Sequence, residues 1–235
     1  MSSGTEPPAA SSPPPSGIKG EVLIEEPDRA ERAIARRAAE ARATVPDMEL
    51  TAEVEMHRAA SYVDDSGTVI AVLARACAVA LQAVPRANGS YRDGRFELYS
   101  RINVGVILAT EGRYLNPTLF DCERKSIEQL AFEVGELERR AGAGELQPGD
   151  LTGATFTLWY PGAAGIASAT PVIVPPQAAA LAAGAIRTAP VVRDGIVVPG
   201  YAMTTTLACD HRILYGAQAA AFLTTIKTVL EETNL

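Results

Sequence analysis

The residues best suited to chemistry stand together near the C-terminus, in the run Asp210-His211-Arg212. The chain has only two histidines, and His211 lies between an extended run over residues 201–208 and a helical run over residues 217–230. An imidazole fixed between a strand and a packed helix has the restricted geometry that a general base needs. The same position also suits a hydrogen-bonded core histidine, and spacing alone leaves both interpretations open.

The elements that must position this run follow from the pattern of apolar residues. After His211, apolar side chains recur at helical spacing, at Ala219, Phe222, Leu223, Ile226 and Leu230. Further helices are predicted over residues 29–42, 68–84 and 126–141. Strands are predicted over residues 48–56, 96–99, 102–109, 115–120, 155–158 and 196–208, with a hairpin turn at Asp194-Gly195 before the last. His211 is therefore expected at the joint between the last strand and the last helix.

Composition and charge argue against several classes of function. The net charge of −7, without a basic stripe, argues against a nucleic-acid partner. Apolar runs are interrupted short of the roughly 18 residues that a membrane span needs, and no secretory signal is visible. Cys77, Cys122 and Cys209 have neither a CxxC pattern nor metal-ligand spacing. We expect a cytoplasmic protein with reduced thiols, no metal and no membrane partner.

The N-terminal residues differ in composition from the rest of the chain. Residues 1–17 are mostly proline, serine, alanine and glycine, a composition that buries too little apolar surface to fold. We therefore predict a disordered tail over residues 1–17 and one domain over residues 18–235.

Ordered motifs along the chain resemble the catalytic domain of the dihydrolipoamide acyltransferases of 2-oxo acid dehydrogenase complexes. Asp210-His211-Arg212, followed by Gly216, is similar to the family signature Asp-His-Arg-x-x-Asp-Gly. Thr155-Phe156-Thr157-Leu158 and Pro175-Pro176-Gln177 also resemble family motifs, and the matches run in order from about residue 30 to 230. The resemblance implies an α/β fold of the chloramphenicol acetyltransferase type, a mixed β-sheet with flanking helices. It also implies a homotrimer with active sites between subunits.

The resemblance assigns roles to several residues. In the family the signature histidine deprotonates a thiol or hydroxyl that attacks an acyl thioester, so His211 is the expected general base. Asp210, Arg212 and Arg37, the arginine of the opening helix motif, are expected to support the site.

Two positions depart from the family pattern. Tyr215 stands in place of the second signature aspartate, so it provides a ring but no countercharge for an arginine. Trp159 stands where the family places the hydroxyl that binds the oxyanion, and Tyr160 follows it. Trp159, Tyr160 and Tyr215 are candidates for an oxyanion donor or for a wall of the acceptor pocket, and plain aromatic packing is the alternative for Trp159 and Tyr160.

The departures and the absence of a lipoyl domain from the sequence favour an acyltransferase that uses acetyl-CoA as donor and carries no covalently bound lipoate. The chain resembles the O-acetyltransferases of tetronate polyketide biosynthesis, which implies a small-molecule hydroxyl acceptor. Two alternatives stay open: a degenerate, non-catalytic trimeric scaffold, and the lipoamide acyltransferase core of a 2-oxo acid dehydrogenase complex.

Overall fold

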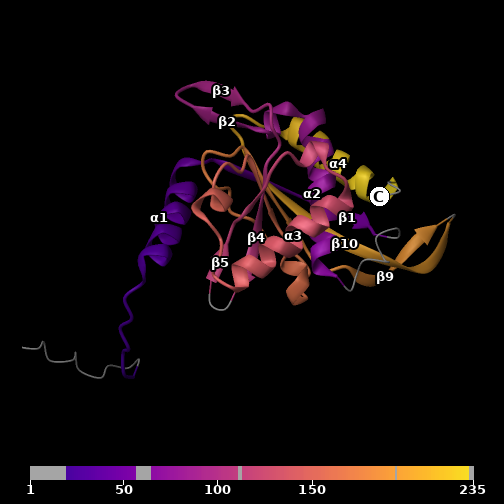
Figure 1. The fold of residues 1–235 in the computed structure, drawn as a ribbon. Helices are drawn as coiled ribbons and strands as arrows, with labels where there is room; N and C mark the ends of the chain where they lie inside the picture. Colours follow the sequence, from indigo (N-terminus) through magenta and orange to yellow (C-terminus); the bar gives the residue numbers. More distant parts are fainter. Residues whose placement is uncertain (1–19, 57–64, 111–112, 194, 233–235) are drawn as a thin grey trace, which may run out of the picture. The chain divides into compact units, whose positions relative to one another are not determined.

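The computed structural model describes residues 20–56, 65–110, 113–193 and 195–232 (Figure 1). The chain divides into two compact units, residues 1–35 and residues 36–235. Helix α1 (Arg29–Thr44) begins in the first unit. There the Glu31 N–H donates to Asp28 Oδ1 (2.9 Å) and the Asp28 N–H donates to Glu31 Oε2 (2.6 Å). These reciprocal bonds satisfy two otherwise free N–H groups at the helix start. The predicted tail over residues 1–17 lies outside the described residues.

A mixed eight-stranded sheet organises the second unit (Figure 1). Its main path runs β1 (Asp47–Glu55), β10 (Ile196–Asp210), β8 (Ala179–Ala183), β7 (Phe156–Trp159), β4 (Val104–Thr110) and β5 (Arg113–Leu115). Off this path, β6 (Thr118–Leu119) pairs with β4 and β9 (Arg187–Arg193) pairs with β10. The β4–β7 and β7–β8 pairs are parallel and the others are antiparallel. The predicted α/β architecture with a mixed sheet is confirmed.

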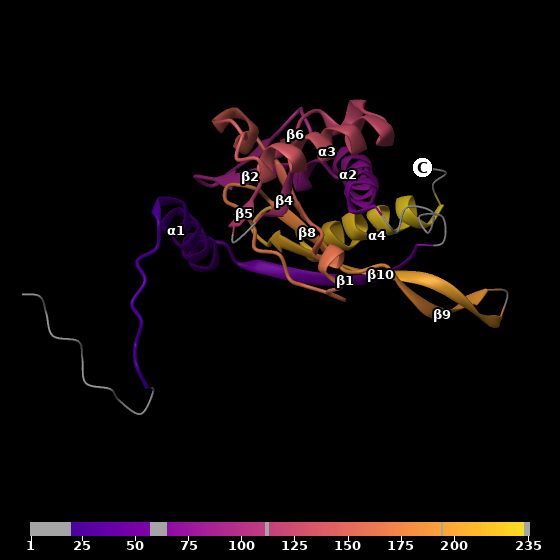
Figure 2. The ribbon, with the colours of Figure 1, turned by 60° about the horizontal axis from the view of Figure 1, so that its bottom comes forward.

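Three helices cover one face of this sheet (Figure 2). They are α2 (Ser66–Ala83), α3 (Ile127–Gly142) and α4 (Gly216–Glu232). The rings of Phe156 on β7 and Phe222 on α4 meet edge to face with centroids 5.8 Å apart. By length and composition α2 could cross a bilayer, but 67% of that stretch is buried inside the protein. It is apolar nearly all round because it contacts α3, α4 and the sheet.

Smaller elements connect these layers. A separate hairpin consists of β2 (Gly89–Arg92) and β3 (Arg95–Leu98). Short 3₁₀ turns lie at Pro85–Ala87, Cys122–Arg124, Pro148–Leu151 and Pro161–Ala164. The strand predicted over residues 115–120 is interrupted at Pro117, whose carbonyl accepts from the Val106 N–H (2.8 Å). Proline has no N–H to donate to a ladder, which explains the break.

Candidate active site

The signature run occupies the turn that follows β10. The His211 N–H donates to the Pro46 carbonyl (2.9 Å), at the start of the neighbouring strand β1. Ile213 and Leu214 are fully buried, and both of their N–H groups donate to the Asp210 carbonyl, at 3.1 and 2.9 Å. The His211 side chain itself is exposed. Backbone bonds and buried neighbours therefore fix the turn while the imidazole faces outward, which excludes the core-histidine interpretation in the single chain.

Asp210 and Arg212 form an ion pair beneath this turn. Arg212 Nε donates to Asp210 Oδ1 (2.9 Å), and Arg212 Nη2 donates to Asp210 Oδ2 (2.7 Å). The Arg212 backbone N–H also donates to Oδ1 (2.9 Å). The Asp210 side chain is only 3% exposed, against 34% for Arg212. Hydrogen bonding to this carboxylate raises the pKa of Arg212 above its ordinary value. This bidentate ion pair fixes the backbone on both sides of His211.

Tyr215 packs against the candidate base. Its ring meets the His211 ring edge to face, with centroids 6.2 Å apart. The Arg86 guanidinium lies 5.6 Å from the Tyr215 centroid and 4.6 Å from the Phe96 centroid, both within cation–π range. In the single chain, Arg86 and not the predicted supporting residue Arg37 is the arginine at the Tyr215 ring. Arg86 comes from the turn after α2 and Phe96 from β3, so no local pattern could have placed either residue there.

Arg37 occupies a different environment. It is exposed on α1, and its side chain forms no ion pair or hydrogen bond with any residue in the described part of the chain. Its role in supporting the site stays a prediction.

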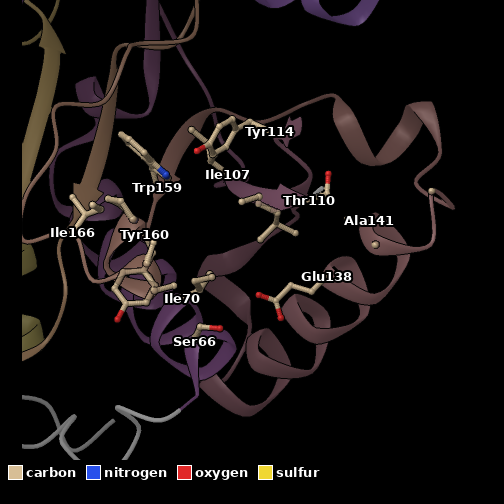
Figure 3. Close-up of a pocket in the computed structure, with 17 residues that line it drawn as sticks. Ser66, Ile70, Ile107, Thr110, Tyr114, Glu138, Ala141, Trp159, Tyr160 and Ile166 are labelled. Atoms are coloured by element: carbon tan, nitrogen blue, oxygen red, sulfur yellow. The ribbon is translucent and has the colours of Figure 1, made fainter. Parts of the chain in front are cut away.

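Trp159 ends β7 and lines a cavity of about 940 Å³, which we call the Trp159 cavity (Figure 3). Tyr160 and Tyr114 contribute two further rings to its lining, and Ile70 and Ile166 contribute aliphatic surface. Burial raises the pKa of the Tyr160 phenol above its ordinary value, so at neutral pH this phenol keeps its proton and can donate it in a hydrogen bond. Trp159 and Tyr160 are thus brought together at one cavity.

The Trp159 cavity and His211 lie toward opposite ends of the strands. Trp159 pairs with Ala182 on β8, and Ala182 pairs with Thr206 on β10. His211 follows Thr206 by five residues, which corresponds to roughly 17 Å along an extended strand. Two strand spacings, about 10 Å, separate them across the sheet. One chain alone therefore does not bring His211 and Trp159 to a common substrate.

The cysteines offer no alternative nucleophile. All three are free and buried. Burial raises the pKa of Cys209 to about 11 and that of Cys122 to about 12, so these thiols stay protonated at neutral pH. Within the described ranges, no three His, Cys, Asp or Glu residues cluster as metal ligands.

Comparison with known proteins identifies the family. Residues 24–235 match the model of the 2-oxoacid dehydrogenases acyltransferase catalytic domain. The acetyltransferase component of the pyruvate dehydrogenase complex of Zymomonas mobilis is 33% identical over 211 residues. That alignment covers 86% of this chain and 48% of the relative, so the chain spans about half of the relative's length.

Solved structures agree with this match. The dihydrolipoamide acetyltransferase of Azotobacter vinelandii has a TM-score of 0.85 at 25% identity, covering 96% of this chain and 97% of that chain. That structure comes from work on the role of a serine, a histidine and an asparagine in its catalytic mechanism. A catalytic core of the 2-oxoacid dehydrogenase complex from Thermoplasma acidophilum has a TM-score of 0.81 at 26% identity, covering 91% of this chain and 100% of that chain. Chloramphenicol acetyltransferase shares the fold, at a TM-score of 0.51 and 15% identity over 83% of this chain and 94% of that chain. The chain therefore belongs to the 2-oxoacid dehydrogenase acyltransferases through their catalytic domain, and it is an acyltransferase.

Proposed function

We propose that this acyltransferase moves an acetyl group from acetyl-CoA to a thiol or hydroxyl of a small acceptor, with His211 as general base. The observation that carries the proposal is the exposed His211 imidazole on a turn fixed by Asp210 and Arg212, in a chain of this family. A base held in place by its backbone and by a buried ion pair needs little reorganisation when it accepts a proton.

The Azotobacter vinelandii enzyme supports these assignments. Its serine lies 52 positions before its histidine and its asparagine lies four positions after it. Trp159 and Tyr215 have the same spacing to His211. In our proposal this chain keeps the base and replaces both of the other side chains, so the base chemistry is retained while its surroundings are rebuilt.

The proposed reaction transfers the acetyl group directly from the CoA thioester to the acceptor. His211 takes the proton from the acceptor S–H or O–H, and the freed electron pair attacks the thioester carbonyl carbon. Trp159 or Tyr160 donates a hydrogen bond to the oxygen that becomes negative. The carbon–sulfur bond then breaks, and the departing CoA thiolate receives the proton from the imidazolium. The products are an acylated acceptor and free CoA.

We place each site between two copies of the chain, within a homotrimer. His211 and Trp159 lie toward opposite ends of the strands, so a site that uses both needs His211 from one copy and the Trp159 cavity from the next. Closed cyclic assemblies repeat such a head-to-tail contact at every interface.

A second candidate function is favoured by the relatives. The relatives from Zymomonas mobilis and Corynebacterium glutamicum are acetyltransferase components of pyruvate dehydrogenase complexes, which favours a lipoamide acyltransferase core as the role of this chain. Dihydrolipoamide would then be the acceptor. O-acetylation of a tetronate stays a hypothesis that the comparisons do not support, and the intact His211 turn argues against a non-catalytic scaffold.

A transfer assay separates these candidates. The purified chain is incubated with acetyl-CoA and either dihydrolipoamide, a hydroxylated tetronate or a panel of small alcohols, and the acceptors are analysed by mass spectrometry. We expect an acetylated acceptor together with free CoA. No acetylation of any acceptor above the rate without enzyme would contradict the proposed function.

Replacing Trp159 by serine is expected to raise the acceptor KM by about 10- to 100-fold, because a large aromatic contact is lost. The KM for acetyl-CoA should change less than about twofold, since we assign Trp159 to the acceptor pocket. Steady-state kinetics that vary each substrate in turn measure both values. Trp159→Phe is the matched control and should keep most of the affinity. Undiminished acceptor affinity, or faster transfer to dihydrolipoamide, in Trp159→Ser would refute a rebuilt acceptor pocket.

A further inference from the structure

The Trp159 cavity contains one carboxylate that the proposed reaction does not use. Glu138 extends from α3, and its carboxylate points into the cavity opposite Tyr160 and Ile70 (Figure 3). Among the described residues that line the cavity, Glu138 is the only one with a charged side chain. The cavity therefore combines aromatic and aliphatic walls with a single negative group.

Among the side chains that the structure describes, no cation neutralises this carboxylate. No ion pair or hydrogen bond joins the Glu138 carboxylate to another described side chain. The two arginines that follow it on α3 are already paired elsewhere. Arg139 binds Glu136 (3.3 Å) and Glu145 (3.0 Å), and Arg140 binds Asp150 (2.8 Å). The Glu138 carboxylate is therefore open to a cation from outside this set of side chains.

A second carboxylate increases the negative charge nearby. A Cβ added to Gly67, at the start of α2, would lie 3.4 Å from Asp65 Oδ1 and 3.7 Å from Glu138 Oε2. Asp65 accepts hydrogen bonds from the Gly67 N–H (3.0 Å) and the Thr68 hydroxyl (2.5 Å), and the Thr68 bond lowers its pKa. Burial, with the charge of Asp65, raises the pKa of Glu138. A cation in this part of the cavity would offset both the burial and the repulsion.

We propose that the acyl acceptor is a small molecule with an apolar, ring-shaped body and an ammonium group that binds Glu138. The proposal rests on the proposed function, because it names the acceptor class of the same site. Trp159 and Tyr160 supply ring faces that attract both the apolar body and a cation. An anionic acceptor, such as an ionised tetronate, would meet the Glu138 carboxylate, and no described lining residue supplies a basic side chain to compensate for the repulsion.

Binding can be measured without any acyl transfer, because Trp159 is the only tryptophan in the chain. Its fluorescence, excited at a wavelength that phenyl rings do not absorb, reports whether the cavity is occupied. The probes are 2-phenylethylamine, 2-phenylethanol and 3-phenylpropionate at neutral pH, which share a ring and differ in charge. We expect the amine to bind about tenfold or more tighter than the alcohol, and the carboxylate to bind weakest.

The variants locate the cause of this preference. Glu138→Gln keeps the shape of the side chain and removes its charge. The affinity for the amine should then lie within about twofold of the affinity for the alcohol. Glu136→Gln, on the same helix but paired with Arg139, should leave the preference unchanged. Equal binding of amine and alcohol to the natural protein, no binding of any probe, or an amine preference that survives Glu138→Gln would overturn the proposal. An amine preference without acyl transfer would sustain the cationic site and refute the proposed function instead.

Discussion

Replacing His211 by alanine is expected to lower kcat/KM for acetyl transfer by about 10²–10⁴-fold, or about 2.7–5.5 kcal/mol. The reason is that the acceptor proton then has no base in place when the thioester is attacked. The fold should be unaffected because the imidazole is exposed and the turn is held by its backbone and by Ile213 and Leu214. Steady-state kinetics and light scattering on the same sample measure both properties.

The matched control for this experiment is His211→Asn. Asparagine retains a polar side chain of similar reach but has no group that accepts a proton near neutral pH. Both variants should therefore be equally slow. An unchanged transfer rate in both variants would show that another group is the base. A near-natural transfer rate in His211→Asn, with a low rate in His211→Ala, would assign His211 a positioning role.

Replacing Arg212 by methionine is expected to lower the free energy of unfolding by about 3–5 kcal/mol, because it leaves the Asp210 carboxylate buried without a countercharge. The Asp210 side chain is 3% exposed, so water cannot replace the lost guanidinium. For a chain of this size such a loss lowers Tm by about 6–20 °C. Thermal and denaturant unfolding measure it.

Arg101 provides a control with nearly the same geometry. Its guanidinium forms two hydrogen bonds to Asp121, at 2.7 and 2.6 Å. Here the arginine side chain is 58% exposed and the aspartate 26% exposed, so solvent screens the pair. Arg101→Met should lower the free energy of unfolding by less than about 1 kcal/mol. Equal losses for the two arginine variants would refute the view that the buried carboxylate determines the cost.

Local sequence patterns predicted most of the elements. Helices α2, α3 and α4 carry apolar residues at helical spacing, and their predicted ranges agree with the structure within a few residues. Strand β8 was missed because its residues, Ala179–Ala183, are buried on both faces and show no alternation. Its two neighbours in the sheet, β7 and β10, pair with its two edges, and no local signal reveals such pairing.

The candidate site was predictable where its parts are adjacent in sequence. The turn with His211 lies between two regular elements, so its position followed from the sequence. The place of Arg86 beside Tyr215 and that of Glu138 in the Trp159 cavity depend on contacts between distant segments. The likeness to the family placed Trp159 near the chemistry, but the sequence did not show that one chain keeps Trp159 and His211 apart.

In the proposed trimer, His211 of one copy acts at the Trp159 cavity of the next copy. Mixed trimers test it directly. His211→Ala and Trp159→Ser chains carry different affinity tags and are co-expressed, and oligomers that contain both are purified through both tags in turn. Every mixed trimer then has one interface with an intact His211 and an intact Trp159, so we predict about one third of the natural kcat/KM for the acceptor. A value no higher than that of the better single variant, or a failure to recover mixed oligomers, would contradict the claim.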